Sequence, residues 1–108
     1  GDIYRSVSSF TSVEDEINVI PSIMFLSQNY PNPFNPTTRI NYMVNSSENI
    51  TIKIYNILGK EIKTLLSEYK QPGTYFIDFD ASYLPSGVYF YRIISGNYSE
   101  TKKMMLLR

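Results

Sequence analysis

The sequence lacks histidine, cysteine and tryptophan altogether. The chain can therefore form no disulfide, and it offers no thiolate nucleophile, no histidine general base and no Cys/His zinc site. Alanine, the strongest helix former, occurs once in 108 residues. Isoleucine occurs 13 times and tyrosine 10 times, and β-branched and aromatic residues favour strands. The composition therefore favours one small all-β domain and removes many of the side chains that enzymes use.

The chain also lacks net charge, since ten basic residues balance ten acidic ones. A balanced chain gives no reason to expect nucleic acid as a partner, and no apolar run approaches the roughly 18 residues that cross a bilayer. The balance conceals a separation of charge. Residues 1–20 carry a net charge of −3 and residues 102–108 a net charge of +3. Such terminal asymmetry is typical of linkers and tails.

Residues 1–24 show no sustained periodicity. They contain several serines, an acidic cluster at residues 14–16, and Pro21. This pattern predicts a linker over roughly residues 8–24. Regular patterning begins at Phe25, so the folded domain is predicted to span residues 25–108.

The rest of the chain alternates between apolar-patterned segments and turns. Seven segments are predicted as strands, at residues 25–30, 38–44, 50–55, 61–68, 74–80, 88–94 and 98–107. Segment 61–68 also fits helical spacing but is short and uncapped. Seven short strands at a spacing of roughly 10–12 residues predict an antiparallel β-sandwich.

Half of the six prolines lie within residues 31–36. Proline fixes φ and has no N–H donor, so this run cannot lie inside a sheet. We predict a rigid, shaped loop formed by Pro31, Asn32, Pro33, Phe34, Asn35 and Pro36.

Two carboxylates two residues apart, Asp78 and Asp80, are candidates for chemistry. Side chains at i and i+2 of a strand share a face, so the pair could act in acid–base catalysis or bind calcium. The alternation of Tyr75, Ile77 and Phe79 favours the alternative, in which both carboxylates simply face solvent. We predict no metal and no cofactor. The many tyrosines leave a carbohydrate-binding surface open, although tyrosine is also an ordinary residue of sandwich cores.

The last predicted strand places Lys102 and Lys103 before four apolar residues, 104–107. Four consecutive apolar residues make both faces of a strand apolar. Either the strand is covered on both sides, or it is an edge offered to a partner, or to a second copy in a homodimer, by strand addition.

Three blocks of the sequence together resemble a known family. They are residues 26–38, which contain the proline-rich run, residues 84–92 and residues 102–107. The chain is similar over residues 24–108 to the type A C-terminal sorting domain of bacterial type IX secretion, found in the Bacteroidota and related phyla. The resemblance implies an immunoglobulin-like seven-stranded antiparallel β-sandwich that is not an enzyme.

The resemblance also implies a route. Such domains are carried by cargo that enters the periplasm, and the outer-membrane translocon and its shuttle proteins read them there. A surface sortase then cuts the linker, and the cargo is attached to the cell surface or released. Residues 1–24 would be the end of the cargo and the linker, with the cut near residues 13–25, and residues 25–108 the sorting domain.

The resemblance assigns candidate recognition roles within two of the three blocks. These residues are Gly87, Tyr89, Tyr91, Lys102, Lys103, Met104, Met105, Leu106 and Leu107. The proline-rich loop would add a preorganised surface. The alternatives are a carbohydrate-binding or adhesive module and a structural domain of the flagellar hook-cap type.

Overall fold

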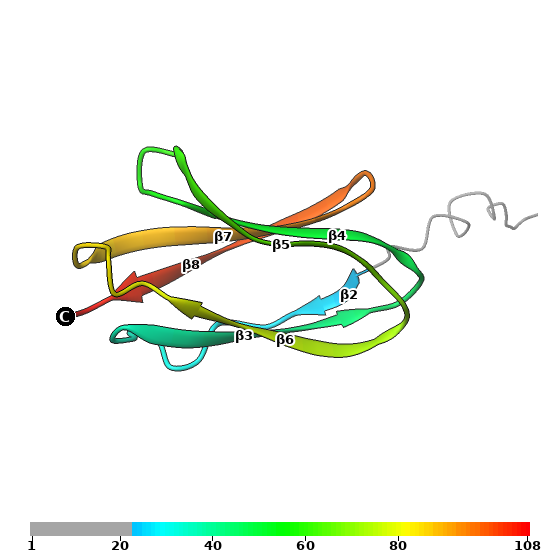
Figure 1. Cartoon of the computed structure of the whole chain (residues 1–108), viewed down its shortest axis with the longest axis horizontal. Helices are drawn as coiled ribbons and strands as arrows, with labels where there is room; N and C mark the ends of the chain where they lie inside the picture. The colour runs from blue at the N-terminus through cyan, green and yellow to red at the C-terminus, as the bar shows by residue number, and fades with distance from the viewer. Residues whose placement is uncertain (1–22) are drawn as a thin grey trace, which may run out of the picture.

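The computed structural model describes residues 23–108, which form two stacked antiparallel sheets (Figure 1). The smaller sheet has the order β2-β3-β6 and the larger the order β5-β4-β7-β8. The strands are β2 (Ile23–Leu26), β3 (Thr37–Val44), β4 (Glu48–Tyr55), β5 (Glu61–Lys70), β6 (Gly73–Asp80), β7 (Gly87–Ser95) and β8 (Tyr98–Leu106). The prediction of an all-β, immunoglobulin-like sandwich of seven antiparallel strands is confirmed.

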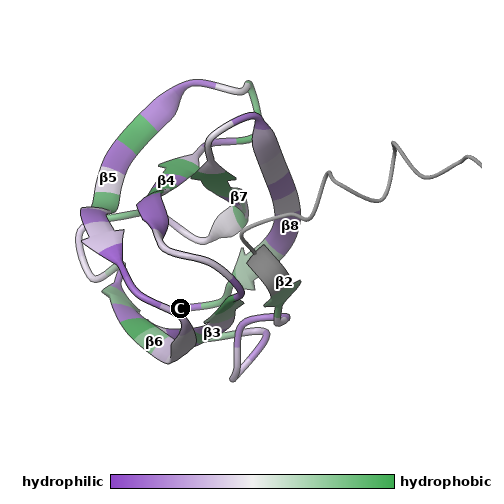
Figure 2. Cartoon of the chain, turned by 90° about the vertical axis from the view of Figure 1, so that its right-hand side faces the viewer, coloured by the Kyte–Doolittle hydropathy of each residue, from purple (hydrophilic) through white to green (hydrophobic). Residues whose placement is uncertain are grey.

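Alternation builds the core as the sequence pattern predicts. In β3 the even-numbered side chains from Thr38 to Val44 point inward, and in β4 Ile50, Ile52 and Ile54 are completely buried. An end-on view shows the strands of both sheets surrounding this core (Figure 2). The core is therefore made by period-2 patterning from both layers.

Two strand predictions differ in detail from the structure. The first strand covers Ile23–Leu26 rather than residues 25–30, because the chain leaves regular strand pairing before the prolines. Ser27 and Tyr30 still form backbone hydrogen bonds with β3. In β5 the pairing with β4 skips Ile62 and Leu65, which marks two bulges. Bulges explain why the apolar residues of this strand resemble a helical spacing.

The two ends of the sandwich carry different parts of the chain. The described chain starts at Ile23, beside Val44, at one end. The opposite end holds the proline-rich loop, the β4–β5 hairpin tip, the β6–β7 loop and the C-terminal residues (Figure 1). The predicted linker, acidic cluster and cleavage region lie mostly or wholly in residues 1–22, outside the described residues.

We expect the free energy of unfolding to fall above pH 10. Burial raises the pKa of Tyr91 and of Tyr42 to about 12, so an unfolded chain ionises these phenols first. The unfolded state then binds fewer protons than the folded state, and stability is lost as the pH rises from 10 towards 12. Urea unfolding from pH 8 to 11.5 measures this. Tyr91→Phe should flatten the decline, and an unchanged slope in that variant would contradict the assignment.

Candidate recognition surface

The proline-rich loop joins the two sheets. The ring of Phe34 is buried and lies against Phe79, with 6.2 Å between ring centroids. The Phe34 N–H donates to the Met105 carbonyl and the Leu107 N–H donates to the Phe34 carbonyl, both at 2.9 Å. These two bonds form a parallel bridge to the end of β8. The predicted loop therefore pairs with the last strand and contributes to the core.

Two polar side chains extend this contact along the edge of β8. The side-chain amide of Gln28 donates to the Lys103 carbonyl at 2.7 Å. The Met105 N–H donates to Asn32 Oδ1 at 3.0 Å. Backbone groups on the outer edge of β8 are thus satisfied from Lys103 onward by residues 28–34, and this half of the edge is closed to strand addition.

A small buried network fixes the start of the proline-rich loop. Asn29 Nδ2 donates to Thr38 Oγ1 at 2.9 Å and to the Pro31 carbonyl at 3.1 Å, and Thr38 Oγ1 donates to the same carbonyl at 2.8 Å. Both side chains are buried. The sequence prediction missed this pair because their partner is a backbone carbonyl, which leaves no motif of its own. The network gives the loop a fixed shape.

The tail strand is divided by its alternation. Met104 and Leu106 are 1% exposed and belong to the core, whereas Met105 is 39% and Leu107 49% exposed. Lys103 is exposed, and Lys102 is half-buried with its Nζ 3.6 Å from Glu100. The four consecutive apolar residues, 104–107, are therefore not covered on both sides. One face of the strand packs in the core, and the other face is exposed.

Arg108 ties the tail to the β6–β7 loop. Its N–H donates to Ser86 Oγ at 2.9 Å, and its Nη1 lies 2.6–3.3 Å from the carbonyls of Ala81, Ser82 and Leu84. The sequence prediction left out Arg108, because an arginine that caps loop carbonyls cannot be told from a solvated one by spacing.

The predicted tyrosines of β7 face inward. Tyr91 is fully buried, and its hydroxyl donates to the Ser27 carbonyl at 2.5 Å. Tyr89 is 5% exposed, and its hydroxyl donates to the Pro85 carbonyl at 2.7 Å. Gly87 begins β7 opposite Leu106. These hydroxyls hold loops on two sides of the core. The Tyr91 ring is fully buried, and the Tyr89 ring is nearly so but lines a hollow beside the β6–β7 loop.

The exposed tail side chains continue onto the outer face of the four-stranded sheet. Met105 pairs with Val88, and Lys103 pairs with Phe90, which in turn pairs with Tyr55. We call this surface the tail face; it consists of Lys53, Tyr55, Val88, Phe90, Arg92, Lys103, Met105 and Leu107. Its one neighbouring anion among the described strands, Glu61, lies 3.2 Å from Lys53, and this contact lowers the pKa of Glu61. The tail face is therefore apolar and basic.

The two carboxylates considered for chemistry have structural partners. Asp78 accepts from Arg39 Nε at 2.8 Å, and this hydrogen bond lowers the pKa of Asp78. Asp80 Oδ1 accepts from the Ser82 N–H at 2.9 Å. Within residues 23–108 no cluster of three or more potential metal-ligating side chains occurs. The described part of the chain also contains no helix long and apolar enough to cross a membrane.

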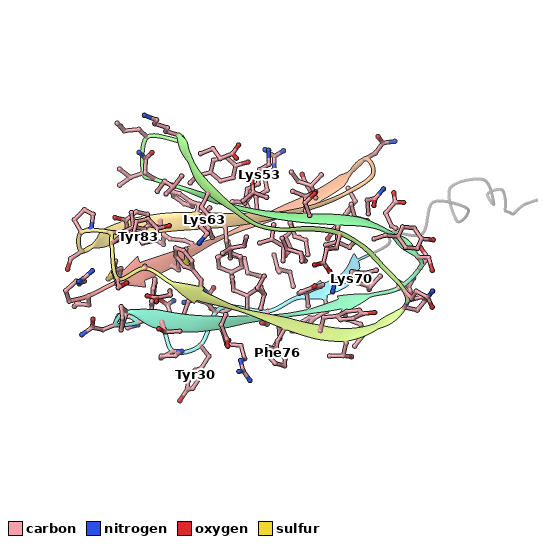
Figure 3. All side chains as sticks on the ribbon, in the orientation of Figure 1. Tyr30, Lys53, Lys63, Lys70, Phe76 and Tyr83 are labelled. Atoms are coloured by element: carbon pink, nitrogen blue, oxygen red, sulfur yellow. The ribbon has the colours of Figure 1, made fainter. Side chains whose placement is uncertain are left out.

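Cationic side chains lie against some of the exposed aromatic rings. The Arg39 guanidinium lies 3.8 Å above the ring of Phe76, and Lys63 lies 5.9 Å from the ring of Tyr83. Tyr30 is 79% exposed and points, like Phe76, away from the core (Figure 3). A sugar could not stack on the side of Phe76 that Arg39 covers, which weakens the carbohydrate-binding alternative.

The described residues form a small two-sheet sandwich with no cluster of three or more potential metal ligands. Residues 28–107 match the family described as the secretion system C-terminal sorting domain, and the chain belongs to this family. The domain is the C-terminal sorting signal of type IX secretion, so the protein is exported and reaches the cell surface or is secreted.

A solved structure has a similar fold. The crystal structure of dimeric latent PorU from Porphyromonas gingivalis superposes with a TM-score of 0.60 at 19% sequence identity. The match covers 82% of this chain and 10% of that chain. At this identity the likeness concerns the fold alone. No curated protein matches the sequence.

We expect Phe34→Ala to lower the free energy of unfolding by about 3–5 kcal/mol, as for other buried phenylalanines. Phe25→Ala is the matched control, because Phe25 is 54% exposed, and should change stability by about 0.5 kcal/mol. Urea unfolding of the 108-residue chain measures both. If Phe34→Ala lowered the free energy of unfolding as little as Phe25→Ala is expected to, the assignment of Phe34 to the core would be contradicted.

Arg108→Ala should loosen the β6–β7 loop. We expect amide hydrogen exchange at Leu84, whose N–H donates to the Ala81 carbonyl at 3.0 Å, to accelerate by about tenfold, as the loss of hydrogen bonds worth about 1–3 kcal/mol implies. Arg92→Ala, which loses a single 3.4 Å contact to Ser99, is the control. Unchanged exchange at Leu84 would contradict the capping role.

Proposed function

We propose that the type IX machinery reads this domain as a folded sandwich, through the tail face, rather than as a linear peptide. One observation carries the proposal: the tail strand divides its residues between the core and the surface. Met104 and Leu106 are 1% exposed, so a receptor could reach them only by unfolding the domain. Lys103, Met105 and Leu107 are accessible without any rearrangement.

Direct recognition is therefore assigned to the exposed half of the predicted residues. Lys103 supplies a charge, and Met105 and Leu107 supply apolar surface. Met104, Leu106, Tyr89 and Tyr91 act indirectly, because they hold the strand that carries these side chains. Lys102 contributes less than Lys103, since Glu100 neutralises it at 3.6 Å.

The proline-rich loop acts as a support for the tail in this proposal. Exposed Pro31, Pro33 and Asn35 form its outer surface, while Phe34 fixes the end of β8. A homodimer or receptor that added a strand to β8 would have to use the half before Lys103, because the remainder already pairs with residues 28–34.

Residues 1–24 are proposed to be the end of the cargo and the linker, and residues 25–108 the signal. Transit through the periplasm, shuttle proteins, a translocon receptor and a surface sortase that cuts the linker complete the route. The described chain begins at the end of the sandwich opposite to the proline-rich loop (Figure 1), which supports separate sites for cutting and for recognition. The domain itself is proposed to be non-catalytic, because Asp78 and Asp80 are engaged in structural contacts.

A reporter fusion tests the tail face. A folded reporter with a Sec signal is joined to residues 1–108 and expressed in a type IX-competent cell. Deleting the tail would confuse recognition with folding, since Met104 and Leu106 are core residues. The variant is instead Lys103→Glu with Met105→Ser and Leu107→Ser, which should leave the unfolding midpoint nearly unchanged and retain the reporter in the periplasm.

The control for this experiment carries equivalent changes elsewhere. Lys63→Glu with Phe25→Ser and Met43→Ser alters one lysine and two exposed apolar residues outside the tail face. This variant should be displayed on the surface like the unmodified fusion. Normal display of the tail-face variant, or equal retention of both variants, would refute recognition through the tail face.

A further inference from the structure

The tip of the β4–β5 hairpin exposes two aliphatic side chains to solvent. Ile57 is 66% exposed and Leu58 is 88% exposed, the highest value among the large apolar residues that the structure describes. Hairpin tips ordinarily carry polar or turn-forming residues, because an exposed aliphatic side chain contributes nothing to the core. Neither residue is explained by the stability of the sandwich.

The tip is held in one conformation. Asn56 Oδ1 accepts from the N–H groups of Leu58 and Lys60, both at 2.9 Å. The Asn56 N–H donates to the Lys60 carbonyl and the Gly59 N–H donates to the Asn56 carbonyl, again at 2.9 Å. Gly59 has a φ of +85°, which favours glycine. An anchor that is ordered before binding loses little conformational entropy when it docks.

A hollow lies beside this tip. It has a volume of about 470 Å³ and is formed by the base of the hairpin, Leu84 and Pro85 of the β6–β7 loop, and Tyr89. Its lining is mainly apolar, and Lys60 and Glu61 also contribute to it. A projecting aliphatic pair beside a hollow forms a surface of complementary shape for a partner side chain.

The tip is continuous with the tail face. Tyr55, at the end of β4, immediately precedes Asn56 and pairs with Phe90, which pairs with Lys103. The hairpin tip rises beyond the four-stranded sheet on the side away from the three-stranded sheet (Figure 1). The register therefore places Met105 and Val88, and then Phe90 and Tyr55, on one face of the sheet, and the chain passes from Tyr55 directly into the tip.

Charge indicates the partner's chemistry. On the outer face of the four-stranded sheet Lys53, Arg92 and Lys103 face a single described anion, Glu61, which is engaged with Lys53. Lys60 adds a further cation at the tip. A complementary partner surface is apolar with acidic residues at its rim.

We propose that Ile57 and Leu58 are a second anchor for the same receptor that reads the tail face, and that this receptor is a protein with an acidic-rimmed apolar socket. This inference rests on the proposed function, because it extends the tail face to the other edge of one continuous surface. The hollow beside the tip accepts an apolar side chain of the receptor, and Lys60, which contributes to its lining, orients the approach.

The test uses the reporter fusion with Ile57→Ser and Leu58→Ser. We expect surface display to fall by about tenfold, the loss typical of removing a central apolar anchor, with an unchanged urea midpoint. Tyr69→Ser with Phe25→Ser, which removes two other exposed aromatic residues, is the matched control and should be displayed normally. Adding Lys60→Glu to the tip variant should lower display further if the socket is acidic, because Lys60 lies at the tip and outside the tail face.

The outcomes separate this inference from the proposed function. Normal display of the tip variant, with retention of the tail-face variant, overturns the second anchor alone. Normal display of both variants overturns the tail face as well. Light scattering of the purified chain decides between a receptor and a second copy: a dimer that Leu58→Ser converts to a monomer would overturn the assignment to a receptor.

Discussion

The bridge between Phe34 and the end of β8 is the contact on which the rest of this structure depends. It places a proline-rich segment, which cannot enter a sheet, across the gap between the two layers. The ring of Phe34 fills the core, and its backbone satisfies Met105 and Leu107 on an edge that would otherwise be open. One residue thereby closes the sandwich, protects an edge and fixes the orientation of the tail. The buried Asn29–Thr38 network and the Arg108 contacts hold the segments on either side of it.

Strand geometry lets β8 serve both the core and the proposed recognition surface. Successive side chains of β8 point to opposite faces, so the residues of this strand that complete the core are not those on its exposed face. Lys103 and Met105 are displayed on a rigid surface because Met104 and Leu106 are packed beneath them. The same logic applies across the sheet, where buried Tyr89 and Tyr91 alternate with half-buried Val88 and Phe90. The tail face is therefore ordered before any partner binds.

Most of the fold could be predicted from the sequence because period-2 alternation depends on local patterning alone. The inward positions of Ile50, Ile52 and Ile54 and of Phe79 followed directly from it. Contacts between distant segments could not be predicted in this way. Nothing in the sequence around Gln28 indicates that its amide meets Lys103, 75 positions away. The bulges of β5 were hidden because an extra residue shifts the pattern. The candidate recognition residues could be named as a group from the sequence, but their division between core and surface required the β7–β8 register.

Because β8 comes after the other six strands in the described chain, the folded sorting domain can form only once β8 is present. Phe34 and Leu106 are far apart in sequence yet adjacent in space, so the core remains incomplete until the last strand has been synthesised and has paired. A chain that stops upstream of Met104 lacks two core side chains, Met104 and Leu106, together with the exposed Met105 and Leu107. Closure of the sandwich therefore depends on β8 being present and paired with both β7 and the proline-rich loop.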